Sequence, residues 1–238
     1  MADFLLIHGA CHGAWCWRDL IPALTALGHG ARAIDLPGNG ADTTPHDQVT
    51  LAASGAAVLA ASTPETIVVG HSWGGFPITA AAEADPKGLR ALVYLCAYFP
   101  SETGLSMVDM RKRAPRQPIL EAVQRSADGL SMTVVPALAP GLFYNDCTPE
   151  QAAWATARLC PQALKPQAEP ITITERYASL PRSYILCRND GTIPPEFQDE
   201  MTRDWPRDRV HELPTGHSPF LSDPQGLAAL LSRIAEAG

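Results

Sequence analysis

Residues 70–74 have the sequence Gly-His-Ser-Trp-Gly, and this pentapeptide constrains the fold more than any other part of the chain. An apolar run at residues 66–69 precedes it and small residues follow it, which predicts a strand, a sharp turn at Ser72 and a helix. In a G-x-S-x-G elbow the strained serine backbone pushes the hydroxyl clear of the sheet, and the glycines let neighbouring segments approach closely. The N–H of Trp73 then points to a helix start that favours an anion. The pentapeptide alone is a weak signal, but with the strand before it and the partners described below, Ser72 is the predicted nucleophile.

Short apolar runs alternate with helix-like segments along most of the chain. The runs predicted as strands are residues 4–7, 31–36, 66–69, 89–96, 183–187 and 209–213. Repeated β-α units favour a six-stranded, mainly parallel sheet with helices on both faces, which is an α/β fold. The alternation breaks at residues 101–179, where prolines are scattered and no clear strand is expected. We therefore predict a core made of residues 1–100 and 180–238, and an inserted helical cap at 101–179.

The composition excludes several classes of partner. The formal net charge is -7 and no run of Lys or Arg longer than three residues is present, so nucleic acid and anionic membranes are poor partners. No basic stretch leads into an apolar one as in a signal peptide, and we expect a cytoplasmic protein. The 6 cysteines form no C-x-x-C pair, which favours buried thiols over disulfides. No His/Cys cluster has ligand spacing, so we expect no metal and keep metal binding as a weak alternative.

Polar residues follow the predicted strands at the sheet edge where sites form in such folds. Residues 8–10 follow the first strand, Ser72 the third, Asp190 the fifth and His217 the sixth. The chain order Ser, Asp, His is that of α/β-hydrolase triads, so we interpret His217 as the general base and Asp190 as the acid that orients it. The alternatives are a plain Asp-Gly turn at Asp190 and a surface loop histidine at His217.

The loop after the first strand is the usual place of a second oxyanion donor, which predicts this role for the N–H of Ala10. We interpret the rings of His8 and His12 as supports of this loop rather than as catalytic groups. His71 is expected to pack beside the nucleophile. The oxyanion hole predicted from the sequence is therefore made of the N–H groups of Ala10 and Trp73.

Four stretches of the sequence resemble one family closely. LIHGACHGAWCW, GHSWGG, ILCRNDGTIPPEFQ and PTGHSPFLSDPQ are similar to the signature stretches of the plant methylesterase and hydroxynitrile lyase family of α/β-hydrolases and its bacterial esterase relatives. FYNDCTPEQ and ERYASLPRSYI are also similar, while residues 101–140 match poorly. The resemblance implies the α/β-hydrolase fold with a helical cap, the triad and oxyanion hole named above, and no cofactor. Trp73 stands where the family more often has a small or aliphatic residue.

The function predicted from these observations is that of a serine carboxylesterase. It would hydrolyse a small to medium hydrophobic ester through an acyl-enzyme, with a small-molecule ester as its partner and a homodimer left open. Phe143 and Tyr144, in the cap, are predicted to bind substrate or else to pack the cap onto the core. Two other classes remain: a lyase that cleaves a cyanohydrin with the same triad, and a non-catalytic receptor. An intact triad argues against the receptor.

Two positions argue against the lyase. In lyases of the family a threonine follows the first-strand histidine and a lysine follows the catalytic histidine, so that a hydroxyl binds the substrate and an ammonium stabilises cyanide. Here these positions hold Gly9 and Ser218. Glycine offers no hydroxyl and is expected to leave room for substrate beside the oxyanion hole, and serine carries no charge.

Overall fold

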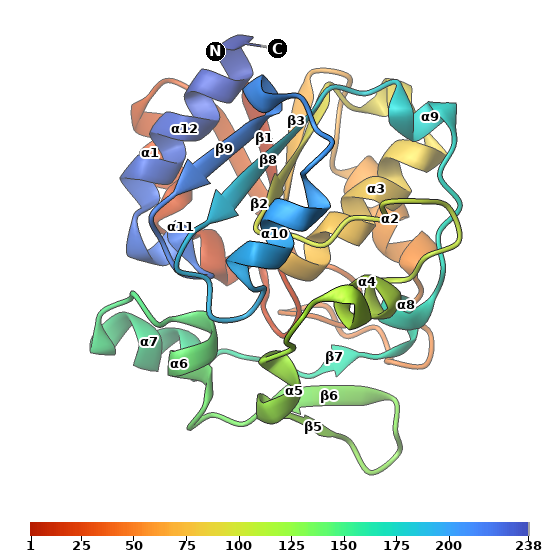
Figure 1. The fold of residues 1–238 in the computed structure, drawn as a ribbon, viewed down its shortest axis with the longest axis vertical. Helices are drawn as coiled ribbons and strands as arrows, with labels where there is room; N and C mark the ends of the chain where they lie inside the picture. The colour runs from red at the N-terminus through yellow and green to blue at the C-terminus, as the bar shows by residue number, and fades with distance from the viewer. Residues whose placement is uncertain (238) are drawn as a thin grey trace.

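The computed structural model describes residues 1–237, and their centre is a six-stranded sheet in the order β2-β1-β3-β4-β8-β9 (Figure 1). Every neighbouring pair in this sheet is parallel. The sheet confirms the predicted α/β-hydrolase architecture, and each strand lies within a few residues of its predicted place. The strands are β1 (Asp3–Ile7), β2 (Gly30–Ile34), β3 (Thr66–His71), β4 (Ala91–Leu95), β8 (Arg182–Cys187) and β9 (Val210–Leu213).

The first strand shows why its sequence is continuously apolar. Successive side chains of a strand point to opposite faces of the sheet. Phe4 and Leu6 therefore belong to one core cluster, and Leu5 and Ile7 belong to the other. All of these side chains are fully buried, because helices cover both faces of the sheet.

The helices of the core divide between the two faces. Figure 1 shows α1 and α12 together on one face, with α11 beside them, and α2 and α3 together on the other. Helix α12 packs through Leu227, Leu230, Leu231 and Ile234, a spacing that gives one apolar stripe on a helix. The helices of the core are α1 (Leu20–Ala26), α2 (Leu51–Ala60), α3 (Gly75–Ala84), α10 (Pro195–Met201), α11 (Pro219–Ser222) and α12 (Pro224–Ala237).

The segment 101–179, which we call the cap, is not purely helical. It contains a small antiparallel sheet in the order β5-β6-β7, where the sequence predicted no strand. These strands are only 2 to 4 residues long, and their hydrophobic residues form no continuous run that could be recognised in the sequence. The cap elements are α4 (Met107–Arg113), α5 (Ile119–Ala122), β5 (Val123–Arg125), β6 (Ser131–Val134), α6 (Ala139–Phe143), α7 (Pro149–Thr156), β7 (Gln162–Ala163), α8 (Lys165–Ala168) and α9 (Glu175–Ala178).

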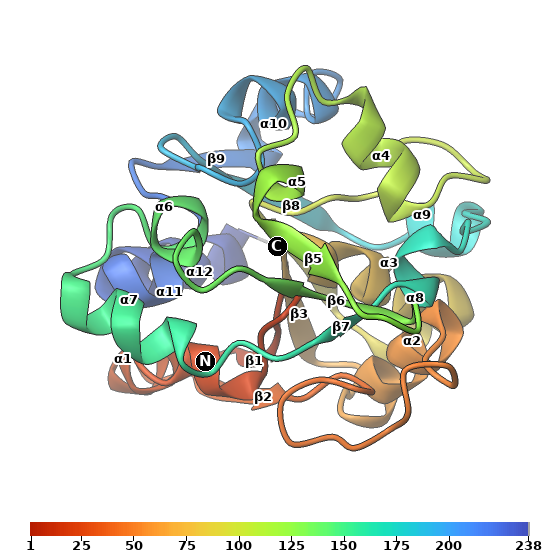
Figure 2. The same cartoon turned by 90° about the horizontal axis from the view of Figure 1, so that it is seen from below.

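Most of the cap lies across the carboxyl ends of the strands. Figure 2 shows β5, β6 and β7 in front of the end of the large sheet, with α6 and α7 on one side and α4 and α8 on the other. This is the edge of a parallel sheet where loops gather and sites form. The division into core and cap as separate units stays a prediction. In the described part of the chain, no helix has the length and apolar character that a membrane span requires.

Candidate active site

Ser72 lies at the carboxyl end of β3, at the start of the 3-10 turn Ser72–Gly74 that leads into α3. Its φ angle is 54°, in the left-handed region that a residue with a side chain adopts only at a cost of about 1–3 kcal/mol. Close packing fixes the turn: a Cβ atom on Gly74 would lie 2.8 Å from the carbonyl oxygen of His8, and one on Gly70 would lie 2.7 Å from that of Gly74. The structure therefore has the elbow that the pentapeptide predicted.

Asp190 and His217 follow the neighbouring strands β8 and β9 and form a buried pair. His217 Nδ1 donates to Asp190 Oδ2 over 2.8 Å, and the two side chains are 1% and 0% exposed. Asp190 Oδ1 also accepts the backbone N–H groups of Thr192 and Ile193 at 2.7 and 2.9 Å. These bonds hold the carboxylate in one orientation, so the imidazole it orients is fixed as well.

Gln198, on α10, completes the surroundings of Asp190. Its side-chain N–H₂ donates to Asp190 Oδ2 and to the carbonyl of Ile193, at 3.0 and 2.8 Å. Its oxygen accepts the N–H of Cys187, at the end of β8, over 3.1 Å. Gln198 is fully buried and ties the acid to the strand that precedes it. This positioning residue was not predicted from the sequence; its one signal there is its place at the end of the ILCRNDGTIPPEFQ stretch.

A cavity of about 30 Å³ brings the predicted groups together. Ser72 and His217 both line it, and Nε2 of His217 is buried without a hydrogen-bond partner among residues 1–237. With Nδ1–H committed to Asp190, this Nε2 is the nitrogen with a free lone pair. The remaining lining residues are Ala10, His12, His71, Trp73, Tyr98, Met107, Arg111, Ile119, Met132, Phe143, Gln167 and Thr192.

His12 connects the cap to the predicted oxyanion loop. Its Nδ1 donates to the carbonyl of Ala10 over 2.8 Å, and its Nε2 accepts the hydroxyl proton of Tyr144 over 2.8 Å. Burial lowers the pKa of His12 to about 3, so the ring is neutral and both bonds keep their direction. This agrees with the supporting role predicted for the ring. The ring of His8 likewise joins the carbonyl of Gly9 to the N–H of Leu36.

Gly9 differs from its predicted role. A Cβ atom there would lie 2.7 Å from His71 Nδ1 and 2.9 Å from Ser72 Cβ, and Gly9 does not line the cavity. The room expected beside it for substrate is filled by these two side chains. Gly9 therefore allows the first-strand loop to approach the nucleophile closely.

The two aromatic residues predicted to bind substrate have different surroundings. Phe143 lines the cavity, and its ring stacks on that of His217 with centroids 5.8 Å apart. Tyr144 is buried and does not line the cavity; it contacts the site through its bond to His12. Trp73 does line the cavity, beside Ser72.

His71, Cys96 and His217 form a cluster that the sequence spacing conceals, with possible ligand atoms within 4.8 Å of one another. His71 Nε2 and Cys96 Sγ both donate to the carbonyl oxygen of His217, at 2.8 and 3.5 Å. Burial lowers the pKa of His71, so its ring is neutral. The cluster thus fixes the backbone of His217, and a protonated Nε2 is unavailable as a metal ligand.

Comparison with known proteins agrees with this geometry. The model of a family described as the alpha/beta hydrolase family matches residues 4–230. The chain is 31% identical to Methylesterase 10 of Arabidopsis thaliana, over 98% of this chain and 91% of that protein. It is also 31% identical to Salicylic acid-binding protein 2 of Nicotiana tabacum, over 98% and 96%. A crystal structure of a pyrethroid hydrolase from Sphingobium faniae superposes with a TM-score of 0.86 at 26% identity, covering 99% of this chain and 98% of that one.

Proposed function

The chain belongs to the alpha/beta hydrolase family, and from this premise we propose that it is a serine carboxylesterase acting through an acyl-enzyme. The observation that carries the proposal is the free Nε2 of His217, which lines the same cavity as Ser72 while Nδ1 is held by Asp190. Relatives that are methylesterases support the hydrolysis of carboxylic esters. The serine mechanism and the type of ester are our inference from the site.

The first chemical step follows from the proton positions. His217 Nε2 takes the proton of Ser72 as the hydroxyl oxygen attacks the ester carbonyl carbon, and Asp190 stabilises the imidazolium that forms. The carbonyl oxygen becomes an oxyanion next to the N–H groups of Ala10 and Trp73. Each such donor contributes about 3–4 kcal/mol to the stability of the transition state. The alkoxide leaves with the proton from His217, and a water repeats the sequence on the acyl-enzyme.

The surroundings of Ala10 support its part in the oxyanion hole. Its N–H donates to no group of the described chain, and its carbonyl is held by His12. The peptide plane is therefore fixed while the donor stays free, which is the preorganisation that an oxyanion requires.

The cavity wall supports a hydrophobic ester as the substrate. Met107, Ile119, Met132 and Phe143, all from the cap, line the cavity opposite Ser72. At about 30 Å³ the cavity is far smaller than the roughly 300–1,000 Å³ of a typical ligand pocket, so cap side chains must move to admit an acyl group. We propose that the cap selects the acyl group in this way.

The test is a comparison of the wild type with Ser72→Ala on p-nitrophenyl and methyl esters of varied acyl length. We expect kcat to fall about 10³-fold or more, because triad residues act as a unit. A fluorophosphonate should label the wild type and an exposed-serine control, Ser179→Ala, but not Ser72→Ala. Labelling of Ser72→Ala at another serine would contradict the assignment. Release of cyanide from mandelonitrile, lost in Ser72→Ala, would favour the lyase instead.

A further inference from the structure

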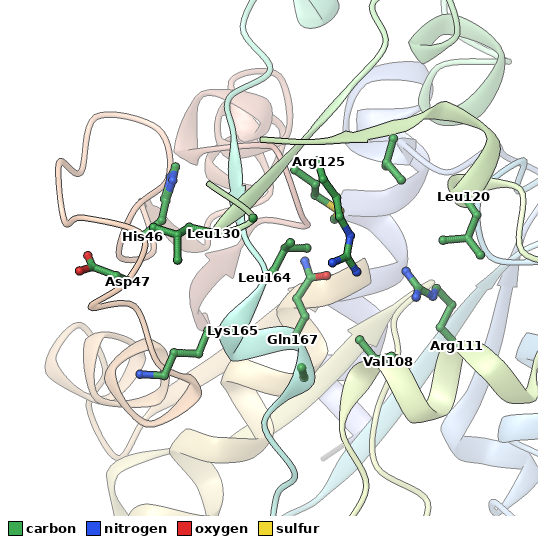
Figure 3. Close-up of a pocket in the computed structure, with 14 residues that line it drawn as sticks. His46, Asp47, Val108, Arg111, Leu120, Arg125, Leu130, Leu164, Lys165 and Gln167 are labelled. Carbon is green, nitrogen blue, oxygen red and sulfur yellow. The ribbon is translucent and has the colours of Figure 1, made fainter. Parts of the chain in front are cut away.

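A second, larger cavity of about 480 Å³ adjoins the one at Ser72 and lies between the cap and the core loop that carries His46 and Asp47 (Figure 3). The two cavities share three lining residues, Arg111, Met132 and Gln167. These side chains therefore form the junction between the outer cavity and the nucleophile. A substrate long enough to reach from Ser72 into the outer cavity contacts them.

Two hydrogen-bond donors at this junction are buried and have no partner among residues 1–237. They are Nε of Arg111 and Nε2 of Gln167, and Gln167 is only 1% exposed. A buried donor without a partner costs about 1–3 kcal/mol, so such groups in a folded protein call for an explanation, and a ligand is one. Both donors belong to residues that line both cavities, so a ligand that spans the junction can satisfy them together.

The positive charges at the junction are not neutralised. The ion pairs of residues 1–237 include none with Arg111 or Arg125. Burial is the main cause that lowers the pKa of Arg111; Tyr98 opposes it, and the nearby Arg125 guanidinium adds to it. By contrast Arg113, on the same helix, pairs with Glu102 over 2.5 Å. An unpaired, half-buried arginine beside a second one favours an anion.

In Figure 3 the polar ends of Arg125 and Gln167 lie near each other in the centre of the view, and that of Arg111 lies to their right. Lys165, His46 and Asp47 lie on the left of the view, and Asp47 is the only carboxylate among the described residues that lines the cavity. In this view Leu164 lies between the two groups and Val108 lies beside Arg111, and both are apolar residues of the lining. The junction therefore places a positive charge in a largely apolar lining between the outer cavity and Ser72.

We propose that Arg111 and Gln167, with Arg125 beside them, bind a free carboxylate of the substrate, so that the enzyme prefers half-esters of dicarboxylic acids. The planar carboxylate accepts from the guanidinium of Arg111 and from the amide of Gln167, while the ester group at the other end of the acyl chain reaches Ser72. The proposal rests on the proposed esterase function and specifies its substrate class.

The test compares matched pairs of substrates. The monomethyl esters of succinic, glutaric, adipic and pimelic acids are each compared with the methyl ester of the monocarboxylic acid of equal chain length. We expect kcat/KM to be at least about tenfold higher for one or more of the half-esters, as a charge-assisted hydrogen bond provides. The ratio should fall to near one in Arg111→Gln and be partly retained in Arg111→Lys. Arg113→Gln, which alters an exposed, paired arginine of the same helix, should keep the wild-type ratio.

A binding measurement separates failure of this inference from failure of the proposed function. Titration calorimetry of Ser72→Ala with adipate or with monomethyl adipate needs no turnover, and binding lost on adding Arg111→Gln would support the carboxylate site. Equal hydrolysis of both members of every pair would overturn the inference and leave the esterase standing. If no ester is hydrolysed, the esterase proposal fails, and the titration alone decides whether the site exists.

Discussion

The carboxylate that orients the base and the polar side chains on the cap wall of the cavity at Ser72 differ in how fully they are hydrogen-bonded, while on the core wall His71 Nδ1 and His217 Nε2 are also buried without a partner among residues 1–237. On the core side, the carboxylate of Asp190 accepts bonds from two backbone amides, from Gln198 and from His217. On the cap side, Arg111 and Gln167 each leave a buried donor without a partner in the described chain. A group that must hold one geometry through a reaction is fully bonded, while groups that meet a variable ligand stay free. We infer that chemistry resides in the core and choice of substrate in the cap.

The largest effect that tests this division is expected at the core acid. Asp190→Asn keeps the shape of the side chain but favours the wrong tautomer of His217, which lowers kcat by up to about 10⁴-fold. Asp109→Asn is the matched control, because Asp109 caps α4 by bonding to Ser106 and lies outside the cavity. Steady-state kinetics on one short ester measures both. Near-normal activity in Asp190→Asn would mean that another carboxylate orients His217.

The next effect concerns the close approach of the first-strand loop to the nucleophile. In Gly9→Ala the new Cβ atom meets His71 and Ser72, and a displacement of about 1 Å at the reacting group costs roughly 10²-fold in rate. We expect kcat to fall by this amount for short and long esters alike. Gly141→Ala, in the cap helix α6, is the control because a Cβ atom there meets nothing within 4 Å. An active Gly9→Ala would show that the loop can move away from Ser72.

Asp190 and Gly9 also show which features of the site could be predicted from the sequence and which could not. Ser72, Asp190 and His217 could be predicted because each follows an apolar strand, and parallel strands bring their carboxyl ends to one edge. The close packing at Gly9 could not be predicted, because it depends on where His71 lies in the folded protein. The role of Gln198 could not be predicted for a similar reason, because it depends on hydrogen bonds to groups on separate segments of the chain.

The cap was harder to predict than the core. Its strands pair over only a few residues, so their sequences carry too few alternating positions to separate them from loops. Arg111 lies in a basic run of α4, Arg111 to Arg113, which resembles an ordinary solvated helix end. Only the fold shows that Arg113 is paired at the surface while Arg111 lines the cavity.

A smaller effect should distinguish the two cap aromatics. Phe143→Ala enlarges the cavity at its wall, and we expect the preference for acyl length to shift by about tenfold, the scale at which pockets discriminate between methylene groups. Tyr144→Phe removes only the hydroxyl that bonds to His12, so it should leave that preference near the wild-type value. The measurement is kcat/KM across p-nitrophenyl esters of increasing length. Equal changes for all lengths in Phe143→Ala would mean that this residue only packs the cap.

The smallest expected effect concerns stability and tests whether the contact between cap and core uses a neutral ring. The pKa of His12 is about 3 in the folded protein, whereas an unfolded histidine titrates near 6.5. Between these values the unfolded chain binds one more proton, so the free energy of unfolding falls as the pH is lowered through this window. The contribution is about 1.4 kcal/mol per pH unit well below 6.5. His12→Gln, which keeps a donor and an acceptor, removes this contribution and should make the dependence of the free energy of unfolding on pH shallower by that amount.

Urea unfolding at a series of pH values from about 4 to 6 measures the slope for each protein. His8 and His71, whose pKa values burial also lowers, remain in both proteins and cancel in the comparison. Identical slopes would mean that His12 binds a proton in the folded state and that its bond to Tyr144 breaks in acid.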